Sequence, residues 1–236
     1  MTQRPHEPRL ARVAAMIADP ARSRMLAYLL TGEYASAGEL ARAAGVSPST
    51  ASEHLAKLED SGLVACEPRG RHRYFRLADG EVAHALQALA VLAERGAHAS
   101  AWAHPQRARL REARCCYGHA AGRLGVALLD ALKQQGRTAQ GEDGLELTPA
   151  GVAWLAGLGF VAEPPVRRTR YAYGCLDWSE RRDHLAGSLG RQLLAHFVDQ
   201  GWLRKGSGGD RALTPTPTGR RRLWPYLGLD AAAAPP

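Results

Sequence analysis

Three cysteines and two histidines in the second half of the chain form the group with the clearest chemical potential. Cys115, Cys116 and His119 lie close together in the sequence, and Cys175 precedes His184 by a short interval. Thiolate and imidazole groups are the ligands that zinc and other thiophilic ions prefer, and two thiols at short range can also form a disulfide. These five side chains are therefore candidates for a metal-binding or redox-active site.

A second group of residues, in the first half, combines short hydroxyl side chains with basic ones. Side chains early in the second helix of a helix-turn-helix meet the edges of DNA bases. Glu53 could accept a hydrogen bond from a cytosine amino group, and arginines in a following hairpin would reach phosphates or the minor groove. The candidate DNA-binding residues are Ser47, Ser49, Thr50, Ser52, Glu53, His54, Lys57, Arg69, Arg71 and Arg73.

Capping signals predict the helices that would position this second group. Asp19-Pro20 predicts a helix start, with the aspartate as N-cap and the proline in the first helical position. Ser36 and Glu39 have the spacing of a capping box, which predicts the start of another helix. Gly45 predicts a turn, and Ser47 predicts the N-cap of the helix that follows. Together these signals indicate a helix-turn-helix.

A hairpin and a long helix are expected next. Residues 63–67 and 72–77 have the composition of strands, and 68–71 that of the turn between them. This hairpin would form a wing. From about 79 to 95 the chain is rich in Ala and Leu, with too few polar residues for a lone surface helix, so we expect it to pack against a partner. Its apolar side carries Val82, Leu86, Leu89 and Leu92.

Residues 9–95 resemble the winged-helix repressors of the ArsR/SmtB family. The resemblance implies a homodimer with the first and last helices of this region at the interface. It also implies a protein that represses transcription until an inducer binds. The residues that carry it are Asp19-Pro20-Ala21-Arg22, Glu39-Leu40-Ala41, Ser47 to Leu58, Gly62-Leu63-Val64 and Arg69-Gly70-Arg71 with Tyr74.

Two sensor sites known in that family are missing from this sequence. Arsenic-sensing members carry paired cysteines in the helix before the recognition helix, where residues 37–42 contain none. Zinc-sensing members carry Asp and His ligands on the last helix, and Asp79, His84 and Glu94 do not reproduce that pattern. We therefore expect the inducer to be sensed elsewhere in the chain.

The second half contains an internal repeat, which changes the fold assignment. The sequence from His119 to Gly125 matches that from His184 to Gly190 at an offset of 65 residues. Downstream, Thr148-Pro149 and Thr216-Pro217 both predict helix starts. Each copy is expected to read helix, strand, turn, strand, helix. We predict two small winged-helix-like units packed as a pseudo-symmetric pair.

This pseudo-symmetry predicts where the candidate ligands meet. If residues 115–119 begin a helix, Cys116 and His119 lie one turn apart on one face. His119 and His184 would occupy equivalent positions and gather with Cys116 and Cys175 in one pocket. Two thiolates and two imidazoles suit zinc or another thiophilic ion, and Cys115 adds a third thiol that could capture a soft metal or an arsenical.

Other interpretations of the same residues remain open. Thiol redox sensing would need Cys116 and Cys175 close enough to bridge. An organic ligand could bind an aromatic pocket that includes Tyr117, Asp177 and Trp178. Cysteines are also common as small core residues, in which case the protein would be a DNA-binding module without an inducer. An enzyme would use Cys116 with His119, or Cys175 with His184, as nucleophile and base, but no phosphate loop, oxyanion motif or carboxylate pair accompanies them.

Composition agrees with a regulator that meets a polyanion. The 236 residues carry a net charge of +8, although a mildly basic chain is not by itself a sign of nucleic-acid binding. The N-terminal half is nearly neutral, so its positive charge is local to the predicted wing. No signal peptide or membrane span is recognisable. We expect a cytoplasmic protein without membrane association, in which cysteines stay reduced.

The sequence thus predicts a mainly α protein with small β-hairpin wings. Residues 9–103 would form a winged helix-turn-helix domain for DNA binding and dimerisation, and residues 107–228 a duplicated sensor domain with repeats at about 115–160 and 175–228. The expected function is a dimeric, non-enzymatic repressor that binds a double-stranded operator. An inducer of unknown identity, with a soft metal or metalloid favoured, would release it through the C-terminal domain.

Overall fold

The computed structural model describes residues 10–69, 72–95, 104–163 and 170–229. The chain divides into two compact units at the boundary between Val82 and Ala83. That boundary falls inside a continuous helix, α5 (Gly80–Ala93), which the sequence analysis had assigned to the first domain.

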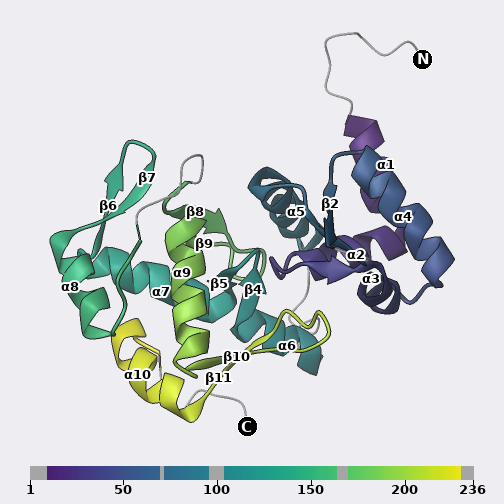
Figure 1. Ribbon diagram of the computed structural model, residues 1–236. Helices are drawn as coiled ribbons and strands as arrows, with labels where there is room; N and C mark the ends of the chain where they lie inside the picture. The colour runs from purple at the N-terminus through teal and green to yellow at the C-terminus, as the bar shows by residue number, and fades with distance from the viewer. Residues whose placement is uncertain (1–9, 70–71, 96–103, 164–169, 230–236) are drawn as a thin grey trace. The chain divides into compact units, whose positions relative to one another are not determined.

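The N-terminal unit is a winged helix-turn-helix, as predicted (Figure 1). Strand β3 pairs antiparallel with both β1 and β2, so β2 and β3 form the wing and β1 closes its inner edge. The elements are α1 (Leu10–Ala18), α2 (Pro20–Leu29), β1 (Ala35–Ser36), α3 (Ala37–Ala44), α4 (Pro48–Asp60), β2 (Val64–Arg69) and β3 (His72–Leu77).

The helix boundaries of this unit follow from the capping residues. Asp19 accepts hydrogen bonds from the backbone nitrogens of Ala21 and Arg22, each at 2.9 Å. Ser36 and Glu39 form the complete capping box. Gly45 ends α3 with φ of 70°, a left-handed conformation that favours glycine. These predictions from the sequence are confirmed.

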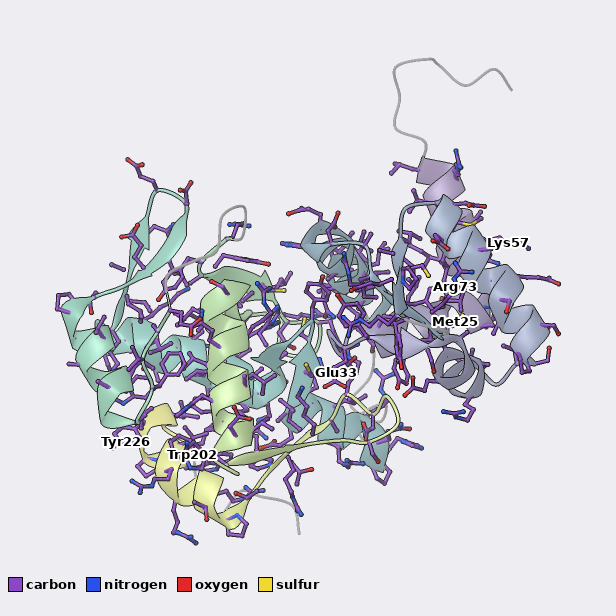
Figure 2. All side chains as sticks on the ribbon, in the orientation of Figure 1. Met25, Glu33, Lys57, Arg73, Trp202 and Tyr226 are labelled. Carbon is purple, nitrogen blue, oxygen red and sulfur yellow. The ribbon has the colours of Figure 1, made fainter. Side chains whose placement is uncertain are left out.

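A single apolar core holds α4 against the other helices and the wing. Helix α4 packs on α2, α3 and β2. Met25, labelled in Figure 2, is fully buried, and Leu55 and Leu58 project inward from α4. Because α4 is anchored by these side chains, its opposite face stays free for other contacts.

The C-terminal unit is built from two copies of one arrangement (Figure 1). Each copy contains a hairpin, a helix, a second hairpin and a second helix. Helix α6 (Pro105–Glu112) precedes the first copy. The first copy is β4 (Arg114–Cys116), β5 (His119–Ala121), α7 (Gly122–Gln134), β6 (Thr138–Gly141), β7 (Gly144–Leu147) and α8 (Pro149–Gly157). The second is β8 (Tyr173–Leu176), β9 (Asp183–Ala186), α9 (Gly187–Asp199), β10 (Leu203–Lys205), β11 (Leu213–Pro215) and α10 (Pro217–Leu227).

The predicted order of helix, strand, turn, strand and helix is therefore present in both copies. One prediction is wrong: residues 115–119 do not begin a helix, but belong to the β4–β5 hairpin with Tyr117-Gly118 in its turn. Tyr117 adopts φ of 51° and Gly118 φ of 89°, which a right-handed helix cannot accommodate.

The duplication includes the capping contacts at the start of the last helix in each copy. Thr148 caps α8 and donates its hydroxyl to the carbonyl oxygen of Gly136 at 2.7 Å. Thr216 caps α10 and donates to the carbonyl oxygen of Gly201, also at 2.7 Å. The two threonines therefore close the same kind of turn in each copy.

The two copies interlock around one core. Helix α7 of the first copy packs on β9 of the second, and α9 of the second packs on β5 of the first. Figure 1 shows α9 running through the middle of this unit. Phe197, Trp202 and Trp224 contribute large buried side chains. Neither copy could bury its helix without the strands of the other.

Helix α5 keeps part of its apolar stripe exposed. Leu89 is 44% exposed and Leu92 50% exposed, while Val82 and Leu86 are partly buried. Helix α5 is apolar but has only 14 residues. No helix in the described ranges is long and apolar enough to cross a membrane.

Candidate metal centre and nucleic-acid interface

Two hairpins, one from each repeat, present the candidate ligands. Across β4 and β5, Cys116 lies opposite His119, and across β8 and β9, Cys175 lies opposite His184. Directly opposed residues in antiparallel strands project from the same face of the sheet. Since β5 and β9 also contact each other, the two Cys-His pairs meet in the middle of the unit.

Three of the five predicted ligands come together there. One ligand atom each of Cys116, Cys175 and His184 lies within 4.8 Å of the other two, and all three residues are buried. The ring of His119 is adjacent, with its centroid 5.1 Å from that of His184. Its Nδ1 atom is buried without a hydrogen-bond partner. We call Cys116, Cys175 and His184 the thiol-imidazole cluster.

Cys115 does not join the thiol-imidazole cluster, contrary to the expectation of a third thiol. Adjacent residues of a strand point to opposite faces. Cys115 consequently packs into the large apolar core with Leu124 and Leu128, while Cys116 packs with Cys175. Burial raises the pKa of the Cys115 thiol to about 11, as expected for a thiol in an apolar core.

Asp177 fixes the orientation of the His184 ring in the thiol-imidazole cluster. Its carboxylate lies 3.3 Å from Nδ1 of His184 and 2.8 Å from the guanidinium of Arg114, and all three side chains are fully buried. A carboxylate on the outer nitrogen of a histidine fixes the ring so that the inner nitrogen faces a metal. The sequence analysis does not identify Arg114, because one arginine at the end of an Arg-rich stretch gives no signal of burial.

Burial and neighbouring groups favour the protonated forms of Cys116 and His184 and the neutral form of His119. Contact with Cys175, together with burial, raises the pKa of the Cys116 thiol well above its usual value. Burial lowers the pKa of His119 well below its usual value, with the neighbouring His184 adding to the effect. Burial opposes protonation of His184, but Asp177 and Cys116 outweigh it and raise the pKa of its imidazole.

Glycines of the repeat motif make room for the two histidines. A Cβ atom on Gly125 would lie 3.3 Å from Cβ of His184, and one on Gly190 would lie 3.1 Å from Cβ of His119. Each glycine therefore accommodates the histidine of the other repeat. The shared sequence from histidine to glycine marks this mutual packing.

Gly125→Ala should destabilise the C-terminal unit by about 1–3 kcal/mol, the usual cost of overpacking a core. The new Cβ would also lie 2.2 Å from the carbonyl oxygen of Ala120. Urea unfolding followed by tryptophan fluorescence measures the change. Gly157→Ala is the matched control, because nothing lies within 4 Å of its added Cβ. Equal midpoints for the two variants would refute the packing argument.

The residues of the organic-ligand hypothesis do not share one site. Asp177 is committed to Arg114 and His184, and Trp178 stacks beneath the Arg114 guanidinium at 4.3 Å. Tyr117 lies in the β4–β5 turn. A separate apolar groove of about 410 Å³ lies beside Tyr171 in the first repeat. These positions favour a structural role for Asp177 and Trp178.

The candidate DNA-contacting residues are mostly on the exposed face of α4. Ser49, Ser52, Glu53 and Lys57 are exposed, and Thr50 is half-buried. Figure 2 shows Lys57 on the outer side of α4. Ser47 caps the helix through the backbone nitrogen of Thr50 at 3.2 Å. The hydroxyl groups at the helix start thus lie together on the part of α4 that the sequence predicts to meet base edges.

His54, which the sequence predicts at a phosphate or on the flank of the helix, points inward. Its Nδ1 lies 3.4 Å from the Arg22 guanidinium, and its Nε2 lies 3.9 Å from the Asp19 carboxylate. Helical periodicity explains this, because His54 lies one turn from the buried Ala51 and from the buried Leu58. The side chain ties α4 to the start of α2.

The wing arginines that the structure describes are exposed and loosely paired. Arg69 contacts Glu67 at 3.2 Å and lies over the ring of Tyr34. Arg73 contacts Glu59 of α4 at 3.0 Å and remains 63% exposed. Arg71, the third predicted contact, lies outside the described residues. Such exposed pairs contribute little stability, so these arginines can exchange their partners for phosphates.

Known proteins resemble this chain over both units. A family model described as a helix-turn-helix domain matches residues 17–67. The uncharacterized HTH-type transcriptional regulator YdfF of Bacillus subtilis is 38% identical over 197 residues, covering 83% of this chain and 87% of that relative. A probable mercury resistance operon repressor of Streptomyces lividans is 36% identical over 78 residues, covering 33% of this chain and 62% of the relative. The solved cadmium metal-sensor CMTR of Mycobacterium tuberculosis shares 39% identity with a TM-score of 0.30, over 34% of this chain and 81% of its own.

Proposed function

We propose that this chain, which belongs to the ArsR/SmtB family of helix-turn-helix transcriptional regulators, is a homodimeric repressor released from its operator by a thiophilic divalent ion. The ion would bind the thiol-imidazole cluster. The relatives are transcriptional regulators and not enzymes, in agreement with the expected non-enzymatic role. The observation that carries the proposal is the buried convergence of Cys116, Cys175 and His184 from two repeats.

The donor set fits a soft metal ion. Two thiolates and one imidazole are ligands typical of zinc, cadmium and mercury. His119 is the candidate for a fourth ligand, because its Nδ1 lacks a hydrogen-bond partner and its lowered pKa keeps the ring neutral. Asp177 would hold the His184 ring in the orientation that turns its other nitrogen to the ion.

Charge balance favours a divalent ion over a monovalent one. Cys116 and Cys175 would each bind as a thiolate, which offsets two positive charges. Asp177 is already balanced by Arg114. Because an unbalanced buried charge is costly, a monovalent ion would leave one negative charge uncompensated. The printed name of one relative, a probable mercury resistance operon repressor, points to the same class of ion.

A second copy of the chain would cover the exposed apolar residues of α1 and α5. Leu10 is 72% exposed, Val13 is 41% exposed, and Leu89 and Leu92 are similarly open. The family resemblance assigns the dimer interface to the first and last helices of this region. Exposed apolar residues on both helices support that arrangement.

Cadmium affinity should rise as the pH rises through neutrality. Binding requires the Cys116 thiol and the His184 imidazolium to lose their protons, and the pKa of each is raised in the free protein. At lower pH the ion must displace more protons, so its affinity falls. Competition between the protein and a chromophoric chelator for Cd²⁺ measures this dependence. A pH-independent affinity would contradict binding through these groups.

A wing variant tests the DNA-binding half of the proposal. The full-length protein would first select its sites from random DNA. Arg71→Ala/Arg73→Ala is then expected to weaken binding and flatten its salt dependence, since each lost phosphate contact reduces the log-log slope by about 0.9. Arg95→Ala/Arg109→Ala, which removes two positive charges distant in sequence from the wing, serves as a charge-matched control. An unchanged slope in the double variant would exclude wing contacts to phosphates.

A further inference from the structure

We infer that the loop from Asp177 to Arg182, between β8 and β9, transmits occupancy of the thiol-imidazole cluster to the end of helix α5. This inference rests on the proposed function, because it concerns the regulation of the same cluster. It names the residues through which an ion bound in the second repeat would act on the helix that crosses the boundary of the two units.

The first end of the loop is fixed to the cluster. Asp177 contacts His184 and Arg114, and its carboxylate also accepts a hydrogen bond from the backbone nitrogen of Gly122 at 2.7 Å. Arg114 in turn donates to the carbonyl oxygen of Leu110 in α6 at 3.1 Å. A change in the position of His184 therefore reaches α6, α7 and the loop through one buried carboxylate.

The other part of the loop is fixed to the end of α5. Arg181 donates to the carbonyl oxygen of Glu94, directly after the last turn of α5, at 3.2 Å. Glu180 accepts from Arg111 of α6 at 2.8 Å. The side chain of Glu94 pairs with Arg107, also of α6. The loop and helix α6 thus both contact Glu94, the loop at its backbone carbonyl oxygen and α6 at its side chain.

The loop is tight, so its two ends move together. The backbone nitrogen of Arg181 donates to the carbonyl oxygen of Asp177 at 2.8 Å, and that of Asp177 donates to the carbonyl oxygen of Arg182 at 2.9 Å. Arg181 has φ of 55°, a left-handed conformation that is unusual for a residue with a side chain. Such a conformation persists only where the surroundings enforce it and is common in switch segments.

Ion binding changes the charges of the groups near the Asp177 carboxylate. The Cys116 and Cys175 thiols and the His184 imidazolium would release their protons to solvent as two sulfur–metal bonds and one nitrogen–metal bond form. The ring must then adjust toward the thiolates, and the carboxylate that contacts it adjusts as well. Because backbone hydrogen bonds hold the loop closed, the adjustment shifts Arg181 and weakens its hydrogen bond to the carbonyl oxygen of Glu94. The exposed leucines of α5 would then be presented differently to a second copy.

The variant Arg181→Ala/Glu180→Gln tests this link without touching the cluster. The matched control is Arg182→Ala, whose exposed side chain pairs with Asp130 at the surface. Full-length proteins are titrated with Cd²⁺ alone to obtain metal affinity, and with selected DNA in the absence and presence of Cd²⁺ to obtain the coupling ratio. Glu180→Gln alone provides a second variant should the double variant not fold.

The double variant should bind Cd²⁺ and DNA separately as the wild type does. The reduction of DNA affinity by Cd²⁺, expected to be about 5–150-fold in the wild type, should fall below about threefold in the double variant and stay unchanged in Arg182→Ala. A double variant with wild-type coupling would overturn the loop assignment and leave the proposed function standing. A wild type that binds no Cd²⁺, or is not released by it, would overturn the proposed function and this inference together.

Discussion

Replacing both cluster cysteines, in Cys116→Ser/Cys175→Ser, should lower the affinity for Cd²⁺ by at least about 100-fold. Loss of a residue that merely orients a ligand commonly costs 10–100-fold, and this variant removes two direct ligands. The DNA affinity without metal should be retained, because the recognition helix belongs to the other unit. Thiolate-to-metal charge-transfer absorption and chelator competition measure the change.

Cys66→Ser is the matched control for this experiment. Cys66 is a free, half-buried thiol on wing strand β2, so its loss should leave Cd²⁺ affinity unchanged. If the control loses the ion while the double variant keeps it, the metal is bound at the wing and the assignment to the cluster is wrong. A peroxide-dependent loss of two thiols from metal-free wild type, absent in the double variant, would instead favour the redox alternative.

Arg114→Met should reduce the free energy of unfolding of the C-terminal unit by about 3–5 kcal/mol, the usual cost of leaving one member of a buried ion pair alone. Arg114 and Asp177 are fully buried 2.8 Å apart. All five tryptophans lie after residue 100, so tryptophan fluorescence during urea unfolding reports on this unit.

Arg109→Met provides the comparison for Arg114→Met. Arg109 also pairs with a carboxylate, that of Asp210 at 3.1 Å, but its side chain is 54% exposed. Exposed pairs typically contribute about 0–1 kcal/mol, so this variant should unfold near the wild-type midpoint. A loss in Arg114→Met no larger than that in Arg109→Met would mean that Asp177 finds compensation elsewhere.

Local signals in the sequence were sufficient for the N-terminal unit. Caps such as Asp19 and Ser36 determine helix starts through their own backbone contacts, and Gly45 is required at a left-handed turn. Such features depend on residues within one helical turn, so they can be read without knowing the fold. The contacts of His54 cannot be predicted in this way, because they depend on α2 and its N-cap, which are distant in sequence.

The duplication can also be recognised in the sequence, but the packing between the two copies cannot. The repeated histidine and glycine could be matched residue by residue, yet only the fold shows that Gly125 packs on His184 and Gly190 on His119. The resemblance of each copy to a winged helix holds for the order of elements. Helices α7 and α9 bury most of their surface in the shared core, unlike α4, which leaves one face open.

The ligand set could be predicted only in part. Identifying Cys116, Cys175 and His184 required the repeat, and the prediction gathered them for the right reason. Assigning residues 115–119 to a helix concealed the alternation that sends Cys115 to the opposite face of β4. Arg114 and Asp177 act through burial and distant partners, which no local pattern of residue types reveals.

The most direct test of the central claim is the anisotropy of labelled, selected DNA bound by the full-length protein during titration with Cd²⁺. We expect release of DNA as the ion reaches one equivalent per chain, with no release from Cys116→Ser/Cys175→Ser. We also expect that Mg²⁺, which prefers oxygen ligands, has no effect. DNA that stays bound at saturating Cd²⁺, or that is released equally from the double variant, would contradict the claim.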